Sequence, residues 1–393
     1  MHLHLKNIGP ISDADIRFGD MTVFVGPQAT GKSIALQFLK LAVDVRYVQT
    51  EMKRYGLDWS ENFLEFFDVY FGEGMSNMWR HSDSAIEWQG EWVSMSSWGE
   101  GKPSSRAESL FFIPAQRVLT LRDGWPRPFT DYKSGDPYVV REFSEKTRML
   151  VDHEFGKEGS LFPHGRRLKK ELRDMLQRSV FAGWELVIDK VQSQKRLALD
   201  IGPGHWSNGT AGGPLPYMVW SAGQREFVPL LLGMYWLMPP SKTARRASIK
   251  WVVLEELEMG LHPRAIDVLL LMVFELVARG YRVCLSTHSS QVLEAVWALR
   301  HLKENGGSPR ALLKVFDAPQ TQAMIKLAKT VMAKKVAVNY FDPASGRTKD
   351  ISELDPDSEE AGESGWGGLT EFSGRANSAV ARAVANARRG KTE

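Results

Sequence analysis

Residues 26–33 read Gly26-Pro27-Gln28-Ala29-Thr30-Gly31-Lys32-Ser33 and match the pattern GxxxxGK(S/T) in full. An apolar, strand-like run ends just before this octapeptide, and apolar residues at helical spacing follow it. A strand, a glycine-rich turn and a helix N-terminus in this order point backbone N–H groups at phosphate oxygens. The octapeptide therefore predicts a phosphate cradle in which Lys32 reaches the β- and γ-phosphates and Ser33 ligates Mg²⁺.

The segments around the octapeptide alternate between strand and helix patterns. We expect strands at 3–8, 21–25, 86–98, 110–113, 250–254, 282–286 and 335–341. We expect helices at 32–45, 50–80, 166–178, 224–237, 263–279 and 377–389. This alternation predicts an α/β fold with a parallel or mixed sheet that helices cover on both faces.

Composition narrows the class of protein. A chain of 393 residues is too long for one compact core, and 43% hydrophobic with 25% charged residues is a globular balance. The single cysteine, Cys284, excludes an internal disulfide framework and a multi-cysteine zinc site. The net charge of +3 provides no overall basic field for nucleic acid.

Nothing in the hydropathy pattern points to a membrane. The longest apolar run, at 228–238, is shorter than the roughly 20 residues that a spanning helix needs. The first residues, MHLHLKNIGP, contain no apolar secretory region. We therefore expect a cytoplasmic protein with no membrane partner.

Two strands predicted downstream end in side chains suited to nucleotide chemistry. The apolar run at 251–254 is followed by Glu255 and Glu256, which suit one carboxylate that holds Mg²⁺ through water and one that polarises an attacking water. The strand at 282–286 is followed by Thr287-His288-Ser289, which places an imidazole where open α/β sheets bind ligands.

Two further segments complete a set of motifs. Gln116 follows the strand at 110–113, and Ser221-Ala222-Gly223-Gln224 begins a helix with a small, donor-rich turn. In chain order the set resembles the Walker A, glutamine loop, signature loop, Walker B, D-loop and histidine switch of ABC-type ATPases of the SMC/RecF/OLD class. The resemblance covers the motif-bearing parts of residues 1–300. It implies an ABC-type P-loop NTPase fold with a mixed sheet, a helical insertion and a C-terminal extension.

The resemblance also implies roles for these residues. ATP and Mg²⁺ would be the cofactors, with Gln116 sensing both and Glu255 contributing to the Mg²⁺ site. Glu256 would be the catalytic base, and His288 would read the γ-phosphate. The signature residues would contact the γ-phosphate of a partner subunit, in a head-to-tail dimer that buries two ATPs; these residues are Ser221, Ala222, Gly223 and Gln224.

Three positions depart from the family pattern. Glu255 replaces the usual aspartate, Leu257 replaces a proline, and Ala222 replaces the first glycine of the signature. These changes affect the Mg²⁺ geometry and lead us to expect slow hydrolysis. Which of the two glutamates is the base follows from alignment with the family.

We expect four regions along the chain. Residues 1–119 form an N-terminal ATPase lobe with an aromatic-rich insertion at 46–100, and residues 120–215 form a helical lid. Residues 216–300 form the C-terminal ATPase lobe, and residues 301–393 form an extension with an acidic linker and a terminal helix. The stretch between Gln116 and Ser221 is too short for the long coiled coils of SMC proteins.

Two further stretches refine the functional expectation. WSAGQREFVPLLLGMY at 220–235 and GWGGLTEFSGRAN at 365–377 resemble stand-alone bacterial ATPases that accompany separate toxic effectors, such as the AriA subunit of the PARIS anti-phage system. This resemblance implies an ATP-dependent scaffold that controls a nuclease or toxin and responds to a DNA or phage-encoded trigger. The alternative is a RecF-like repair ATPase that clamps DNA.

Three isolated sequence features fit either a functional or a structural role. The basic run at 166–170 either contacts nucleic-acid phosphates or forms a solvated face. The tryptophans of 59–98 either stack bases or form a core. Asp355-Pro356-Asp357 resembles the DxD of a TOPRIM nuclease but lacks the preceding strand, so we interpret 353–363 as a mobile acidic linker.

Overall fold

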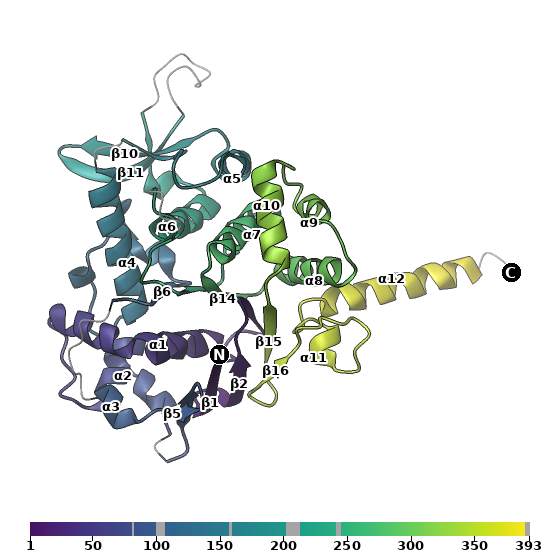
Figure 1. Ribbon diagram of the computed structural model, residues 1–393, viewed down its shortest axis with the longest axis horizontal. Helices are drawn as coiled ribbons and strands as arrows, with labels where there is room; N and C mark the ends of the chain where they lie inside the picture. The colour runs from purple at the N-terminus through teal and green to yellow at the C-terminus, as the bar shows by residue number, and fades with distance from the viewer. Residues whose placement is uncertain (81, 100–106, 157–158, 202–212, 241–244, 390–393) are drawn as a thin grey trace.

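The structure is a computed structural model that describes residues 1–80, 82–99, 107–156, 159–201, 213–240 and 245–389, with side chains through residue 384 (Figure 1). The strands are β1 His2–Ile8, β2 Ile11–Arg17, β3 Met21–Val25, β4 Ala85–Trp88, β5 Glu91–Trp92, β6 Leu110–Ile113, β7 Leu121–Arg122, β8 Trp125–Pro126, β9 Ser160–Phe162, β10 Glu185–Val191, β11 Gln194–Asp200, β12 Leu215–Pro216, β13 Trp251–Leu254, β14 Arg282–Thr287, β15 Val336–Asp342 and β16 Arg347–Asp350. The α-helices are α1 Lys32–Arg54, α2 Phe63–Phe71, α3 Met95–Gly99, α4 Tyr138–Leu150, α5 Lys170–Leu176, α6 Ala222–Leu237, α7 Pro263–Ala278, α8 Ser290–Glu304, α9 Pro309–Val315, α10 Gln322–Met332, α11 Ala361–Ser364 and α12 Glu371–Arg389. Short 3₁₀ or π turns are η1 Met75–Met78, η2 Arg117–Thr120, η3 Phe129–Asp131, η4 Val151–Phe155, η5 Gln177–Phe181 and η6 Tyr217–Val219.

One large mixed sheet organises the molecule. Within the described residues its strand order is β5-β4-β1-β2-β16-β15-β3-β14-β13-β6. The neighbours β15, β3, β14, β13 and β6 run parallel, whereas β1 and β2 form an antiparallel hairpin. The expected α/β fold with a mixed sheet is confirmed.

The register of the parallel strands brings their carboxyl ends together. Val25 of β3 pairs with Thr287 of β14, and Leu254 of β13 pairs with both Leu285 of β14 and Ile113 of β6. Because parallel strands end at the same edge of a sheet, the loops that follow β3, β14, β13 and β6 lie side by side.

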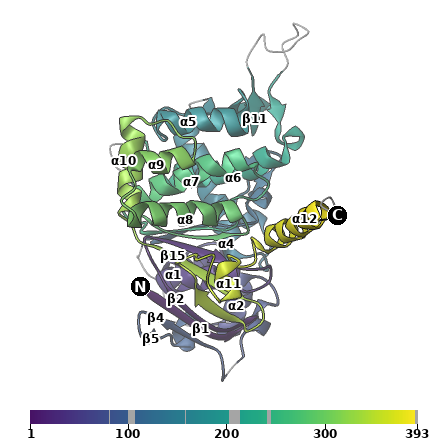
Figure 2. The same cartoon turned by 90° about the vertical axis from the view of Figure 1, so that its right-hand side faces the viewer.

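Both faces of the parallel part of the sheet, formed by β3, β6, β13 and β14, are buried, each by its own core. Val252 and Leu254 of β13 join a core with α6, α7 and α8, whereas Trp251 and Val253 join a core with α1 and α2. Figures 1 and 2 show these two helical layers on opposite sides of the sheet. Continuously apolar strands are typical of a sheet that is covered on both faces.

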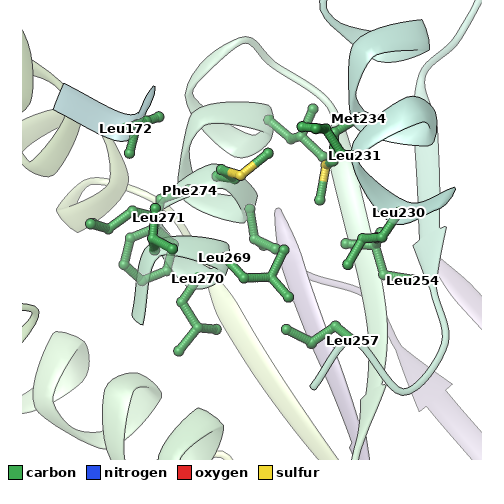
Figure 3. Packing of buried hydrophobic residues seen from close by; sticks show 14 of the residues in the cluster. Leu172, Leu230, Leu231, Met234, Leu254, Leu257, Leu269, Leu270, Leu271 and Phe274 are labelled. Carbon is green, nitrogen blue, oxygen red and sulfur yellow. The ribbon is translucent and has the colours of Figure 1, made fainter. Parts of the chain in front are cut away.

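The layer formed by α6 and α7 also holds the segment that follows β13. Leu257 is fully buried and lies among Leu254 of β13, Leu230 of α6 and Leu269 of α7 (Figure 3). A proline expected at this position by the family pattern is thus replaced by an apolar anchor, which fixes the loop after the two glutamates to the core.

The N-terminal region differs in detail from the expectation. Strand β2 was not predicted, and α1 extends to Arg54, with Asp44 in a non-helical conformation at φ −129°. The prediction of helix over all of 50–80 was wrong, because η1 and loops accompany α2 there. The strands predicted at 86–98 stop at Trp92, after which α3 begins.

The tryptophans of this region mainly form a core. Trp59, Trp79 and Trp98 are buried, and Trp59 donates a hydrogen bond from Nε1 to the Gly99 carbonyl at 2.8 Å. Trp92 is exposed. The buried rings cannot stack on bases, so the structural interpretation of 59–98 is supported for them.

The expected basic helix at 166–178 is shorter, and its charges are largely satisfied. The helix α5 begins only at Lys170. Arg167 is buried, donates to the Tyr235 carbonyl at 2.7 Å and pairs with Glu154, and Lys169 pairs with Glu275 at 2.5 Å. These contacts engage Arg167 and Lys169, whereas Arg166 and Lys170 of the run are exposed.

The region 120–215 is not purely helical. Strands β9, β10, β11 and β12 form a second sheet beside α4 and α5. The glycine-rich part of this region, 202–212, lies outside the described residues. The expectation of a helical lid is therefore corrected to a mixed insertion.

The C-terminal region is partly integrated into the ATPase sheet. Strand β15 lies directly beside β3 and β16 pairs with β15, so 336–350 belongs to the main sheet. The acidic stretch is anchored rather than free, because Leu354 is fully buried and its carbonyl accepts a 3.1 Å hydrogen bond from Trp366 Nε1. The final helix, α12, projects from the body (Figures 1 and 2).

Asp355 and Asp357 lie in an exposed turn after β16, with the Asp357 N–H donating to Asp355 Oδ1 at 2.9 Å. No helix in the described ranges is both long enough and apolar enough to cross a membrane.

Candidate nucleotide-binding site

The octapeptide forms a tight loop between β3 and α1. Gly26 has φ 144° and Gly31 has φ 96°, and a Cβ at Gly31 would lie 2.5 Å from Ile11 Cγ1. Only glycine fits both the backbone conformation and the space at that position. No side chain caps α1 at Gly31, so the first turn of the helix presents its N–H groups to the loop. This cradle fits the phosphate groups of a nucleotide.

Lys32 is held inside the cradle. Its Nζ donates hydrogen bonds of 2.7 Å to the carbonyl oxygens of Gly26 and Pro27. Burial lowers the pKa of Lys32 to about 8, and the nearby carboxylates Glu256 and Glu258 oppose that shift. The ammonium is therefore placed in the loop and faces the acidic end of β13.

Glu255 provides a buried carboxylate at the end of β13. Its Oε2 accepts a 3.0 Å hydrogen bond from the Ala115 N–H, whereas Oε1 has no hydrogen-bond partner among the described residues. Burial raises the pKa of Glu255 to about 7, and the Ala115 N–H and the Ser33 hydroxyl oppose this shift. An unpartnered carboxylate oxygen beside a serine hydroxyl fits Mg²⁺, which prefers oxygen ligands.

Glu256 and His288 meet at the same edge. Glu256 Oε1 lies 3.6 Å from His288 Nε2, and each side chain is about one-third exposed, at 31% and 30%. Glu256 has φ 43°, and its N–H donates to Ser286 Oγ at 3.2 Å. The structure thus brings together a carboxylate and an imidazole that remain accessible to solvent, as a water-activating pair requires.

The signature residues form the N-terminus of α6. Ser221 is its N-cap: Ser221 Oγ accepts from the Gln224 N–H at 3.2 Å, and Gln224 Oε1 accepts from the Ser221 N–H at 3.1 Å. Gln224 Nε2 also donates to the Val180 carbonyl at 3.4 Å. The amide of Gln224 is therefore engaged within its own chain, whereas the exposed Ser221 hydroxyl is an acceptor in the cap and retains its hydrogen to donate.

The signature turn packs against the loop after Glu256. A Cβ at Gly223 would lie 3.0 Å from the Gly260 carbonyl oxygen, so the two loops approach closely. Ala222 is exposed next to this contact. Gln116 lies at the carboxyl end of β6 with an exposed side chain that makes no hydrogen bond to a described residue.

Sequence reasoning missed Arg117, which connects three of the motifs. The fully buried guanidinium donates to the carbonyl oxygens of Glu255 (3.0 Å), Glu256 (3.1 Å) and Glu226 (3.2 Å). Burial lowers the pKa of Arg117, and Glu226 is the first of the carboxylates that oppose this shift. Its position directly after Gln116 was the one indication in the sequence that Arg117 belongs to the site. No spacing pattern identifies a residue that binds backbone carbonyl groups.

Glu258 was also missed. Its Oε1 accepts hydrogen bonds from the His288 N–H at 2.5 Å and from Thr287 Oγ1 at 3.0 Å. The carboxylate therefore holds the backbone of the segment that carries His288. A third glutamate two positions after Glu256 was the signal in the sequence.

Together, the sheet order and the loops at its carboxyl edge define a P-loop NTPase fold of the ABC type. Residues 139–294 match the family model described as "AAA domain, putative AbiEii toxin, Type IV TA system". The match spans less than half of the chain; it includes α6, Glu255, Glu256 and His288 but not the octapeptide.

Solved structures with a similar arrangement include two SMC heads. The SmcHead bound to the C-winged helix domain of ScpA aligns at 10% identity over 89% of this chain and 95% of that chain, with a TM-score of 0.37. The SMC head domain from Thermotoga maritima aligns at 11% identity over 89% of this chain and 97% of that chain, with a TM-score of 0.32. No curated protein sequence matches the chain.

Proposed function

We propose that this protein binds and hydrolyses ATP, with the octapeptide as the phosphate cradle. The observation that carries the proposal is the shared edge of β3, β13 and β14, where Lys32, the glutamate pair and His288 converge. Ser33 and Glu255 would hold Mg²⁺, which supplies charge neutralisation at the β- and γ-phosphates when bound.

The chain's own residues then have distinct tasks. Glu256 orients the attacking water and accepts its proton, because its carboxylate is accessible and Arg117 binds the backbone carbonyl of Glu256 rather than its carboxylate. His288, with its backbone held by Glu258, faces the same space and donates to the γ-phosphate. Glu255 is too deeply buried to activate water and instead serves the metal.

We further propose a head-to-tail pair of chains in which Ser221 acts on the nucleotide of the partner. Exposed apolar side chains lie close to Ser221 in the chain: Met218 and Val219, three and two positions before it, are 69% and 62% exposed. Leu119, which is 59% exposed, lines the same surface cavity as Met218. Large exposed apolar groups that lie together are typical of a surface covered by a partner. This patch supports an interface at the signature loop.

The effect of the ATPase would be exerted on a separate nuclease or toxin in anti-phage defence, as in the AriA-like systems that the tail resembles. The family description of residues 139–294 supports a toxin–antitoxin or defence context. The projecting helix α12, with Phe372 and Val380 at 75% and 63% exposed, is the proposed docking element for that effector. A DNA or phage-encoded trigger would act on the nucleotide-bound assembly in the cytoplasm.

The alternative function, a RecF-like repair ATPase that clamps DNA, is weakened because Arg167 and Lys169 of the basic run form ion pairs within the chain.

Nucleotide binding tests the proposal. Calorimetric titration with ATP and Mg²⁺ should show binding by the natural chain and none by a folded Lys32→Ala variant, because the cradle loses its cation. Equal affinity of the two proteins would refute the assignment.

A further inference from the structure

Glu142 of α4 belongs to a buried cluster of charged side chains where α4 meets α1 and the segment before β6. The side chain of Glu142 is 6% exposed, and that of Lys40 on α1 is fully buried. Because α1 begins in the phosphate cradle and β6 ends at the shared edge of the sheet, the cluster connects α4 with two elements of the nucleotide site. The titratable groups that face Glu142 are Lys40, Asp44 and Tyr47 of α1, Tyr70 of α2, Glu108 before β6, and Tyr138 and Lys146 of α4.

The ammonium group nearest to Glu142 uses all of its hydrogens on other partners. Lys40 Nζ lies 3.3 Å from Glu142 Oε2. It donates hydrogen bonds to Asp44 Oδ2 at 3.2 Å and to Glu108 Oε1 at 3.3 Å. A third hydrogen bond goes to the Leu110 carbonyl at 2.5 Å. Since an ammonium group has three hydrogens, none is left for Glu142, which gains only the electrostatic attraction of Lys40.

The second cation of the cluster, Lys146, is engaged by Glu108. Lys146 Nζ donates to Glu108 Oε2 at 3.0 Å and to the Tyr47 hydroxyl at 2.8 Å. Glu108 therefore has two ammonium partners. When all members are ionised, three carboxylates face two ammonium groups, and Glu142 is the carboxylate that is least well paired.

Glu142 Oε1 is poorly placed to carry a charge. This oxygen is shielded from solvent and accepts no hydrogen bond from any residue that the structure describes. An ionised carboxylate without donors is costly to bury, whereas a neutral carboxyl group loses much less. Burial raises the pKa of Glu142 to about 7, and Lys40 is the first group that opposes this shift. Burial acts on Glu108 in the same direction, but Lys146 and Lys40 outweigh it and lower the pKa of Glu108.

We propose that Glu142 is a pH-sensitive switch: it keeps a proton up to neutral pH in the folded chain, and release of this proton weakens the contact between α4 and α1. While Glu142 is protonated, the carboxylates of Asp44 and Glu108 balance the two ammonium groups. Deprotonation adds a third negative charge that no ammonium hydrogen stabilises. The switch does not depend on nucleotide binding.

The raised pKa of Glu142 determines the direction of the pH effect. Below the ordinary pKa of 4.5 the group is neutral in the folded and the unfolded chain, so it does not change the free energy of unfolding. Between 4.5 and about 7 only the unfolded chain releases the proton, so stability falls as the pH rises. Above about 7 the loss is complete, because both states are ionised.

Urea unfolding of the full chain and of a Glu142→Gln variant tests the proposal, since glutamine has the shape and the neutral charge of the protonated side chain. At pH 8 the variant should be the more stable protein. Its unfolding equilibrium constant should be at least about tenfold smaller than that of the natural chain at the same urea concentration. At pH 5 this difference should be much smaller. The amide hydrogens of α4 should exchange faster in the natural chain than in the variant at pH 8.

Glu108→Gln is the matched control. The side chains of Glu108 and Glu142 are both 6% exposed, but Glu108 has two ammonium partners, so its replacement should destabilise the chain at pH 8. Infrared spectra of the full chain provide a second measurement. The carbonyl band of a protonated carboxyl group should be stronger at pH 6 than at pH 8.5, and the Glu142→Gln variant should lack part of the band seen at pH 6.

Three results would overturn the proposal. Destabilisation by Glu142→Gln at pH 8, in the same direction as by Glu108→Gln, would show that Glu142 is ionised and paired. An equal difference in stability between the natural chain and Glu142→Gln at both pH values would show that no proton is involved. Identical carbonyl bands of these two proteins at pH 6 would show that Glu142 carries no proton there.

Discussion

The guanidinium of Arg117 donates a 3.1 Å hydrogen bond to the backbone carbonyl oxygen of Glu256. The same group binds the carbonyl of Glu255 at 3.0 Å and that of Glu226, on the signature helix, at 3.2 Å. The segment after Gln116 therefore determines where the two glutamates and the signature helix lie relative to one another. Arg117 is a positioning residue in this arrangement, since it binds the two glutamates of the site through their backbone carbonyls and its nearest carboxylate is that of Glu226, at 3.7 Å.

Replacement of Arg117 by lysine should slow hydrolysis while ATP still binds. One ammonium cannot reproduce the planar set of donors that spans three carbonyls, so the glutamate loop loses its support. We expect kcat to fall about tenfold, equivalent to about 1.4 kcal/mol, with little change in ATP affinity. Arg122→Lys is the control, because Arg122 is exposed and pairs with Asp131. A loss of ATP affinity in parallel with kcat would show that Arg117 only maintains the fold.

Replacement of Glu256 by glutamine should leave ATP bound but hydrolysed at least about a hundredfold more slowly. The amide keeps the shape of the side chain but cannot accept a proton from water. Gel filtration with ATP should then show more of the associated species than the natural chain forms. If Glu255→Gln produced this behaviour and Glu256→Gln did not, the two roles would be exchanged.

Truncation of Leu257 to alanine should destabilise the chain by about 2–5 kcal/mol, because the fully buried side chain would leave a cavity between β13, α6 and α7. Urea unfolding monitored by tryptophan fluorescence measures this change. Leu119→Ala, at an exposed leucine, is the control and should change the free energy of unfolding by less than about 0.5 kcal/mol. Equal effects of the two variants would mean that Leu257 is not an anchor.

A charge on the apolar face of α12 should prevent capture of the effector. Val380 and Val384 are exposed one helical turn apart, so Val380→Asp places a carboxylate within the proposed contact. The measurement is co-purification with a nuclease or toxin from a neighbouring gene, the effector that the proposed function requires, and ATP hydrolysis should be unchanged. Ser378→Asp places the same charge on another face of α12 and should not affect capture. Normal capture of the effector by the Val380→Asp variant would show that α12 is not the docking element.

The parts of the fold that follow from local pattern were predictable. The strands that became β3, β6, β13 and β14 are short apolar runs, and each ends in a motif, so their shared edge follows from parallel pairing. Strand β2 contains charged residues at alternate positions, and it pairs along its length with β1 and at Asp13 with Arg347 of β16. Its pattern gave no separate signal. The place of β15 beside β3 depends on pairing between distant segments, which no local pattern encodes.

In the candidate site, too, some residues were predictable from local sequence patterns, whereas others depend on contacts between distant segments. The octapeptide, the glutamate pair and His288 belong to spacing patterns with a chemical reason, so the sequence indicated them. Arg117 and Glu258 act through backbone atoms of other segments, and such contacts appear only when the chain is folded. The hydrogen bond from Trp366 to the Leu354 carbonyl was likewise not predictable from the sequence. The acidic composition of 353–363 alone predicts a mobile linker.

In the proposed dimer, one nucleotide site is built from two chains, with Lys32 from one and Ser221 from the other. The most direct test mixes a Lys32→Ala chain with a Ser221→Asp chain, since aspartate preserves the helix cap but repels the γ-phosphate. Each mixed dimer then keeps one intact site. We expect measurable ATP hydrolysis by the mixture, although neither variant is active alone. No recovery of hydrolysis, with subunit exchange verified, would contradict a site shared between two chains.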